Sequence, residues 1–122
     1  MKSLLIVAHG SRRNQSNEEV KMLADCIARQ EHCEFHDVSA AFLEIAEPSI
    51  PDGLEACINR GASDVVVFPY FLAAGRHVVE DIPAEIAPIT SKYPHVNVHI
   101  APHLGLAEAL PGIIAAMAEQ TR

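Results

Sequence analysis

The sequence has a deficit of positive charge and contains no long apolar run. Nine Lys and Arg residues stand against sixteen Asp and Glu residues, which gives a formal net charge of −7. A module that binds a nucleic-acid duplex needs the opposite balance, so the composition argues against nucleic acid as the main partner. The longest early apolar run, Leu4–Ala8, is far too short to cross a membrane, and no signal-peptide cleavage site follows it. We therefore expect neither a nucleic-acid partner nor a membrane partner.

The sequence also lacks the spacing of a disulfide framework and two common nucleotide-binding motifs. Its three cysteines, Cys26, Cys33 and Cys57, show no CxxC pattern and cannot all pair with one another. This cysteine usage predicts a reduced protein of the cytoplasm. Neither a G-x-x-x-x-G-K-[ST] loop nor a G-x-G-x-x-G run is present, so neither ATP nor a dinucleotide cofactor is indicated.

What is present is a regular alternation of strand-like and helix-like segments. The 122 residues are enough for one compact domain, residues 1–122. Apolar runs predict strands at residues 4–8, 34–43, 64–69 and 96–101. Apolar stripes at helical spacing predict helices around residues 20–28, and at about 48–60, 81–93 and 106–119.

Several residues mark how these helices begin and end. Asn14 or Ser16 is the expected N-cap of the first helix, and Gly61 is expected to end the second. Pro88 is expected to kink or split the third helix. The last helix is expected to turn an apolar face inward, formed by Leu110, Ile113, Ile114 and Met117.

Four strand–helix units in succession predict an α/β fold with a parallel sheet and helices on both faces. The expected architecture is a flavodoxin-like three-layer sandwich with a four-stranded sheet in the order 2-1-3-4. The second strand is less apolar than the others, which places it nearer an edge. In this order the first and third strands lie side by side, and ligands of open α/β sheets bind outside the carboxyl ends of such neighbours.

Residues with useful chemistry follow the strands at this carboxyl edge. His9 follows the first strand, Glu44 the second, and His77 the turn after the third. Each histidine alone is as easily explained as a hydrogen-bonded structural residue, but a pair on neighbouring strands favours function. Two imidazoles and a carboxylate suit Co, Ni, Fe or Zn ions better than Mg or Ca, and imidazole also accepts protons. His103, after the fourth strand, is taken to be a surface histidine without a role.

Arginines accompany both histidines. Arg12 and Arg13 follow His9, and Arg76 precedes His77, so a third of the nine basic residues flank the two histidine turns. Guanidinium groups bind carboxylates and phosphates in a bidentate manner. We therefore expect an anionic substrate at this edge.

Three blocks of the sequence resemble the short CbiX/SirB class of sirohydrochlorin chelatases. The first contains Leu5-Ile6-Val7-Ala8-His9-Gly10-Ser11-Arg12 followed by Asn17-Glu18, and the second runs from Ala41-Phe42-Leu43-Glu44 to Glu47-Pro48-Ser49-Ile50. The third contains Phe71-Leu72, Gly75-Arg76-His77 and Asp81-Ile82-Pro83. The chain departs from some relatives in lacking a histidine-rich tract.

The resemblance implies ATP-independent insertion of a divalent metal ion into sirohydrochlorin, with Co²⁺ on the route to cobalamin as the first choice and nickel or iron as further possibilities. No prosthetic group is implied, because the metal ion is a substrate. By position, His9 and His77 would bind the metal and accept protons, and Glu44 would be the assisting carboxylate. Arg12, Arg13 and Arg76 would bind the carboxylates of the macrocycle. Short members of the family pair as homodimers, so a homodimer is expected.

Other functions remain open at this point. A metal or tetrapyrrole carrier would use the same histidines, and only turnover distinguishes it from a chelatase. A histidine phosphatase shares the His9-Gly10 pair, but Ala8 stands where that class has arginine, and a chromogenic phosphate ester would test it. A flavin-binding protein needs hydroxyl residues after the first strand, and the segment there instead holds one glycine and two arginines.

Overall fold

The structure is a computed structural model that describes residues 1–121. Its centre is a four-stranded parallel sheet in the order β2-β1-β3-β4. The strands are β1 (Lys2–Ala8), β2 (Asp37–Phe42), β3 (Asp64–Pro69) and β4 (Asn97–Ile100). The helices are α1 (Asn14–Ala28), α2 (Ile50–Asn59), α3 (Ile82–Lys92) and α4 (Leu110–Gln120). A π-helical turn (His77–Asp81) leads into α3, and a 3-10 turn (Leu104–Leu106) follows β4.

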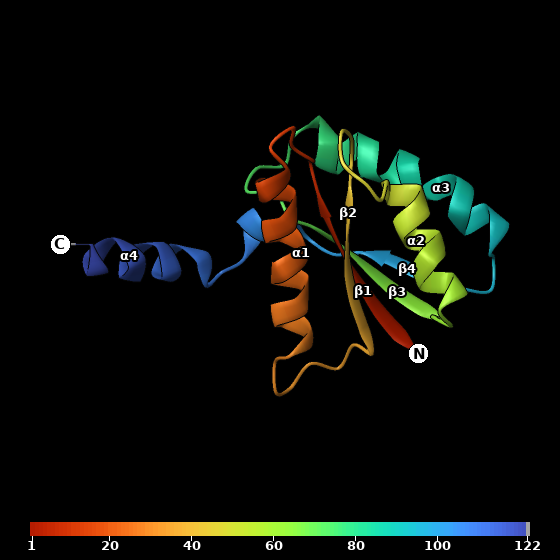
Figure 1. The fold of residues 1–122 in the computed structure, drawn as a ribbon, viewed down its shortest axis with the longest axis horizontal. Coiled ribbons are helices and arrows are strands. Elements are labelled where there is room, and N and C mark those ends of the chain that lie inside the picture. Colours follow the sequence, from red (N-terminus) through yellow and green to blue (C-terminus); the bar gives the residue numbers. More distant parts are fainter. Residues whose placement is uncertain (122) are drawn as a thin grey trace.

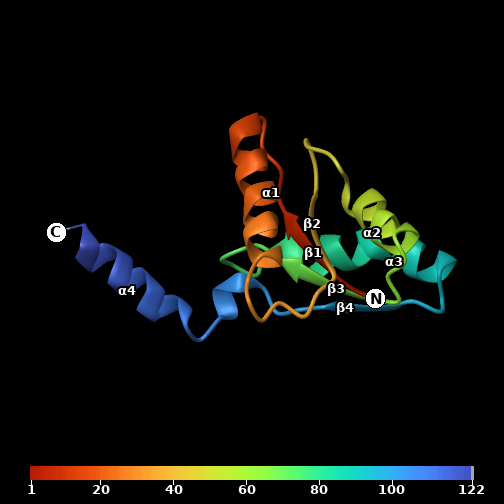
Figure 2. The ribbon, with the colours of Figure 1, turned by 60° about the horizontal axis from the view of Figure 1, so that its bottom comes forward.

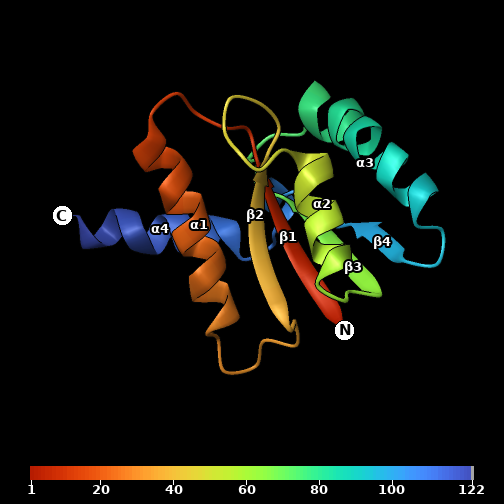
Figure 3. The same ribbon diagram turned by 45° about the vertical axis from the view of Figure 1, so that its right-hand side comes forward.

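The layers confirm the predicted α/β fold and strand order. Helix α1 lies on one face of the sheet, whereas α2 and α3 lie on the other (Figures 1 and 3). Strand β2 is an edge strand, as its mixed composition predicts. Strand β1 is central, and all its residues from Ser3 to Ala8 are buried. A strand buried on both faces explains the uninterrupted apolar run near the start of the sequence.

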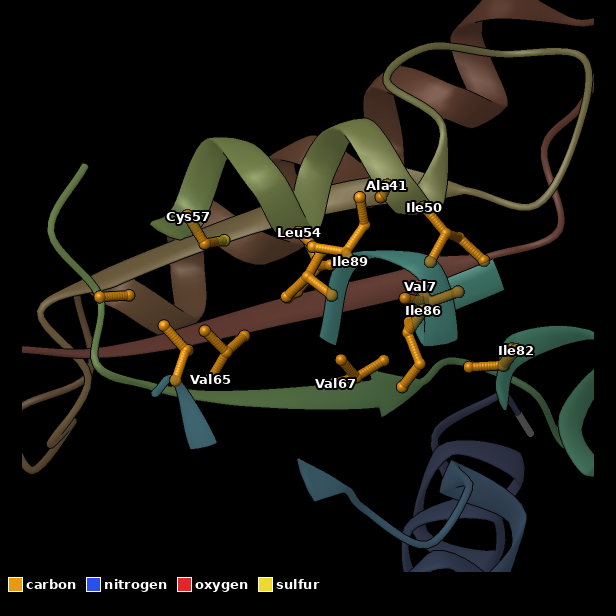
Figure 4. Close-up of a cluster of buried hydrophobic side chains, with 13 residues drawn as sticks. Val7, Ala41, Ile50, Leu54, Cys57, Val65, Val67, Ile82, Ile86 and Ile89 are labelled. Atoms are coloured by element: carbon orange, nitrogen blue, oxygen red, sulfur yellow. The ribbon is translucent and has the colours of Figure 1, made fainter. Parts of the chain in front are cut away.

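The main core lies between the sheet and the helices α2 and α3. Alternate residues of β1 and β3 point into it, and Figure 4 shows the side chains of α2 and α3 that meet them. Most of the large side chains in this core are fully buried: Leu5, Val7, Val65, Val67, Ile50, Leu54 and Ile82. A second, smaller cluster joins Leu4 and Ile6 of β1 to Ala24 of α1. The two clusters hold the carboxyl ends of β1 and β3 side by side.

Some predicted boundaries are wrong by a few residues. Strand β2 begins at Asp37 rather than residue 34, because the preceding residues form the turn that leaves α1. Helix α1 has Arg13 at its N-cap with no side-chain cap, so neither Asn14 nor Ser16 caps it. Helix α2 is capped by Ser49, whose Oγ accepts a hydrogen bond from the Asp52 amide at 3.2 Å.

Pro88 does not split the third helix. Helix α3 runs without a break from Ile82 to Lys92 with Pro88 inside it. Pro88 itself is exposed, so its ring lies on the solvent side, while Ile86 and Ile89 on either side are buried against the sheet. Burial of those isoleucines offsets the one backbone hydrogen bond that proline cannot make.

The prediction that the last helix faces inward is also wrong. No residue of α4 is buried, and Ile114 and Met117 are 58% and 64% exposed. Figures 1 and 2 show α4 projecting away from the sheet, beyond α1. The apolar spacing was correctly recognised, but spacing alone does not specify which surface covers a helix. None of the helices within residues 1–121, α4 included, has the length and apolarity to span a membrane.

The cysteines are free and differ in accessibility. Cys57 on α2 is fully buried, and this burial raises the pKa of its thiol, whereas Cys26 on α1 is exposed. Since the thiolate is the reactive form, iodoacetamide at neutral pH should modify Cys26 and leave Cys57 unmodified until denaturant is added. Peptide mapping by mass spectrometry measures this. Equal labelling of both cysteines in the folded protein would contradict the packing of α2.

Candidate metal-handling site

His9 and Glu44 are brought together by the pairing of β1 and β2. The ladder between these strands continues past their ends, because the Leu43 amide donates to the Ala8 carbonyl at 2.9 Å and the Glu44 amide to the His9 carbonyl at 3.0 Å. The two side chains therefore leave the sheet at the same level. Nε2 of His9 lies 2.8 Å from Oε1 of Glu44, within hydrogen-bond distance.

His77 reaches the same place from β3 through the π-helical turn. Its Nδ1 lies 2.8 Å from Oδ2 of Asp81, four residues further along this turn. The His9 and His77 rings meet edge to face, with centroids 4.7 Å apart. Single π turns inside or beside helices occur frequently at functional sites. The four side chains Glu44, His9, His77 and Asp81 form a continuous group, here called the histidine–carboxylate cluster.

The cluster leaves one nitrogen of each imidazole available. Glu44 occupies Nε2 of His9 and Asp81 occupies Nδ1 of His77, so Nδ1 of His9 and Nε2 of His77 can bind a metal ion or a proton. The two side chains are 44% and 43% exposed. A carboxylate on the far nitrogen fixes the tautomer and orientation of a metal-binding histidine.

An open hollow adjoins the cluster. It measures about 260 Å³ and is lined by Leu43, Glu44, His77, Asp81, Ala84 and Glu85. Within residues 1–121, no three His, Cys, Asp or Glu side chains converge on one metal position. The chemistry available at this edge is therefore that of two imidazoles, each backed by one carboxylate.

The loop that carries Glu44 is strained and closely packed against the turn after β1. Ile45 has φ of 72°, a left-handed conformation that is costly for a β-branched residue. Gly10 has φ of 98°, and a Cβ at this position would collide with the Glu44 carbonyl oxygen. Strain of this kind persists where the surrounding structure enforces it, often at functional sites.

The segment after His9 is fixed by a buried asparagine. Asn17 is only 6% exposed; its Oδ1 accepts from the Ser11 amide at 2.9 Å, and its Nδ2 donates to the Ser11 carbonyl at 2.8 Å. The Arg13 amide in turn donates to the Ser11 hydroxyl at 3.1 Å. The apolar periodicity of this helix did not predict that Asn17 is buried, because a polar residue on a helix is usually exposed to solvent. Asn17 therefore holds the turn that follows His9 and carries Arg12 and Arg13.

The three arginines lie on exposed turns, and within residues 1–121 their side chains make no hydrogen bond or ion pair with the cluster. Arg12 lines a polar hollow of about 550 Å³ that also includes Lys21. Arg13 donates to the Gln15 side chain at 3.0 Å, and Arg76 lies 3.5 Å from Glu80. All three guanidinium groups are therefore accessible to an anionic ligand.

One sequence-based expectation about this edge needs correction. His103 is not a surface residue, because it is only 9% exposed. The 3-10 turn that follows it is held against the segment after β3, where the Gly105 amide donates to the Phe71 carbonyl at 3.1 Å. Asp81 was not among the predicted site residues, although it is the hydrogen-bond partner of His77. The spacing of four residues between His77 and Asp81 was the signal in the sequence that could have indicated this contact.

The comparisons with known proteins identify the family of this chain. The family model described as CbiX matches residues 3–121. The sirohydrochlorin ferrochelatase of Bacillus subtilis (strain 168) is 36% identical over 107 residues, which cover 87% of this chain and 40% of the relative. The sirohydrochlorin cobaltochelatase of Sulfolobus acidocaldarius is 32% identical over 120 residues, which cover 98% of this chain and 92% of the relative.

A solved structure of a chelatase has a similar fold. The chelatase SirB from Bacillus subtilis subspecies spizizenii, in complex with cobalt, has a TM-score of 0.85 and 28% identity, with 98% of this chain and 50% of that chain covered. The chain also spans less than half the length of its curated ferrochelatase relatives.

Proposed function

This chain belongs to the CbiX family, and we propose that it inserts a divalent metal ion into sirohydrochlorin without ATP. The observation that carries the proposal is the pair of imidazoles, His9 and His77, with ring centroids 4.7 Å apart and a carboxylate on each. Relatives named as cobaltochelatase and as ferrochelatase give the same substrate and differ in the metal. In this proposal residues 1–122 form one chelatase unit that acts in the cytoplasm.

The reaction exchanges one metal ion for two protons. When a divalent ion enters the ring, the two pyrrole N–H bonds break and both protons must leave. The free nitrogens, Nδ1 of His9 and Nε2 of His77, bind the arriving metal and then take up these protons, one on each imidazole. Glu44 and Asp81 stabilise the imidazolium that forms, since an opposite charge within hydrogen-bond distance favours the charged form. The reaction therefore needs a free lone pair on each of these two imidazole nitrogens at its start.

Binding of the macrocycle falls to the arginines. Sirohydrochlorin carries many carboxylates, and Arg12, Arg13 and Arg76 offer exposed guanidinium groups on the turns beside the cluster. Peripheral contacts of this kind can offset the cost of bending the ring so that its nitrogen lone pairs point toward the metal. The polar hollow with Arg12 and Lys21 is a further place for a carboxylate.

The proposal also covers the oligomeric state of the protein. The hollow beside the cluster is open and measures about 260 Å³, below the range of about 300–1,000 Å³ that encloses small ligands. A second copy of the chain would supply the other wall, so we propose a homodimer.

The choice of metal is a separate part of the proposal. Imidazole and carboxylate accept Co, Ni, Fe and Zn ions alike. Co²⁺ is our first choice, because cobaltochelatase is the name of the Sulfolobus relative that this chain covers almost completely.

The visible spectrum of sirohydrochlorin tests the proposal. The ring is mixed with Co²⁺, Ni²⁺ or Fe²⁺, with and without catalytic amounts of the protein, and the metallated spectrum is followed in time. We expect many turnovers per chain, fastest with the physiological metal. Stoichiometric binding of metal or ring without turnover would replace the chelatase with the carrier, and neither binding nor turnover would overturn both.

Asp81 is expected to act as a positioning residue for His77. Asp81→Asn keeps the size of the side chain but removes its charge, so the imidazole loses its fixed orientation and insertion should slow about 10- to 100-fold. Asp81→Glu, which restores the carboxylate, should recover part of the rate. Asp52→Asn on α2 is the matched control and should leave the rate unchanged. An Asp81→Asn variant with the wild-type rate would contradict the role of this contact.

A further inference from the structure

Two hollows of opposite charge flank the loop that follows β2. The polar hollow of about 550 Å³, here called the α1-side hollow, is lined by two cations, Arg12 and Lys21, and by a single carboxylate, Glu47. The hollow of about 260 Å³ beside the cluster, here called the α3-side hollow, has no Lys or Arg among the described residues that line it. Its lining includes three carboxylates: Glu44, Asp81 and Glu85. The two sides therefore attract ligands of opposite charge.

The α1-side hollow adjoins the histidine–carboxylate cluster. It is bounded by the two turns that leave the site, since residues 11–12 follow His9 and residues 45–47 follow Glu44. The turns touch each other, because a Cβ on Gly10 would collide with the Glu44 carbonyl oxygen. In Figure 3 the loop after β2 lies between the start of α1 and helix α3. A group bound in the α1-side hollow is therefore next to the histidine pair.

Lys21 holds its charge at this edge of the sheet. Its Nζ lies 6.0 Å from the centroid of the Phe42 ring, the last residue of β2, and an aromatic face attracts a cation at this distance. Its ion pair with Glu18 is 3.5 Å long and lies between two side chains that are 42% and 52% exposed. Surface pairs of this kind are weak. The Lys21 ammonium is thus available to a stronger anionic partner.

The floor of the α1-side hollow is formed before any ligand arrives. Asn17 lines this hollow and is buried, and both polar atoms of its amide group are bonded to the Ser11 backbone. The turn that carries Arg12 is therefore fixed by the protein itself. A site that is already ordered binds its ligand at a lower cost in conformational entropy.

We propose that the macrocycle reaches the histidine pair from the α1 side, with the carboxylates of one edge held in the α1-side hollow by Lys21 and Arg12. Ammonium and guanidinium groups donate charge-assisted hydrogen bonds to carboxylates. The carboxylates of the α3-side hollow repel the same edge of the ring, because like charges brought together are costly. The inference rests on the proposed function. It adds Lys21 as a substrate-binding residue and specifies the side on which the ring binds.

Lys21→Gln tests the anchor. This substitution should raise the KM for sirohydrochlorin about 10-fold, which is the effect of losing one hydrogen bond to a charged group. The kcat and the KM for the metal ion should not change, because Lys21 contacts only the edge of the ring. Lys21→Arg keeps the charge and should restore most of the affinity. Lys2→Gln, at the opposite end of β1, removes the same charge from the protein and is the matched control.

Glu85→Gln tests the side. Our proposal predicts an unchanged KM for sirohydrochlorin, whereas a ring bound over the α3-side hollow would lose a repelling charge and its KM would fall. A lower KM in Glu85→Gln would overturn the inference, and so would an unchanged KM in Lys21→Gln. Circular dichroism checks that the variants keep the fold.

Binding of the metal-free ring separates this inference from the chelatase proposal. The Kd of sirohydrochlorin, measured from its absorption change in the absence of metal, does not require turnover. We expect the Kd to rise about 10-fold in Lys21→Gln and to stay unchanged in Lys2→Gln. A wild-type protein that binds the ring in this way without turnover would overturn the chelatase and keep the anchor. A wild-type chelatase whose Lys21→Gln variant has the same Kd would do the reverse.

Discussion

Replacing His77 or His9 with alanine is expected to reduce cobalt insertion into sirohydrochlorin by about 10²- to 10⁴-fold, the range of positioned acid–base groups. Each variant removes one imidazole that binds the metal and accepts a pyrrole proton. Each also leaves a carboxylate, Glu44 or Asp81, without its partner at 2.8 Å. The double variant should be little worse than either single one, because residues that act as a unit do not contribute additively.

The fold should survive both substitutions. The two histidine side chains are more than two-fifths exposed, and substitutions at such positions usually change stability by about 0.5 kcal/mol or less. Initial rates from visible absorption and melting temperatures from circular dichroism measure the two effects separately. His32→Ala, an exposed histidine in the turn between α1 and β2, is the control and should keep the full rate. Near-normal turnover in His77→Ala would remove this residue from the mechanism.

The features that the sequence predicted well are those that depend on local pattern and sheet topology. The uninterrupted apolar run of β1 and the β-branched run of β3 predicted two central strands. Parallel pairing then required His9 and Glu44 to emerge at one edge, and the structure places them 2.8 Å apart. Their proximity follows from register, which a parallel sheet with one buried core specifies strongly.

The features that the sequence did not predict depend on contacts outside any one element. The hydrogen bond between His77 and Asp81 requires the π-helical turn, and a helix predicted to begin at residue 81 does not contain both residues. The burial of His103 depends on the path of the 3-10 turn, which is held against the segment after β3. The apolar stripe of α4 was visible, but a stripe does not tell whether its own sheet or another surface covers it.

Gly10→Ala is expected to destabilise the fold and to disturb the site, because both the backbone conformation and the space at Gly10 exclude a Cβ. Its φ of 98° is unfavourable for any residue with a Cβ, and a Cβ there would collide with the Glu44 carbonyl oxygen. Left-handed strain costs about 1–2 kcal/mol. Overpacking against backbone adds about 1–3 kcal/mol. We therefore expect unfolding by guanidinium chloride to reveal a loss of about 3 kcal/mol.

Gly61 provides the matched control for this substitution. Its φ of 108° is equally left-handed, but a Cβ there would meet nothing within 4 Å. Gly61→Ala should therefore show the strain alone, about 1 kcal/mol, with full chelatase activity. In Gly10→Ala the Glu44 carbonyl must move, which pulls its carboxylate away from His9, so the insertion rate should fall along with stability. Equal destabilisation of the two variants would mean that the loop carrying Glu44 does not approach the turn after β1 as closely as described.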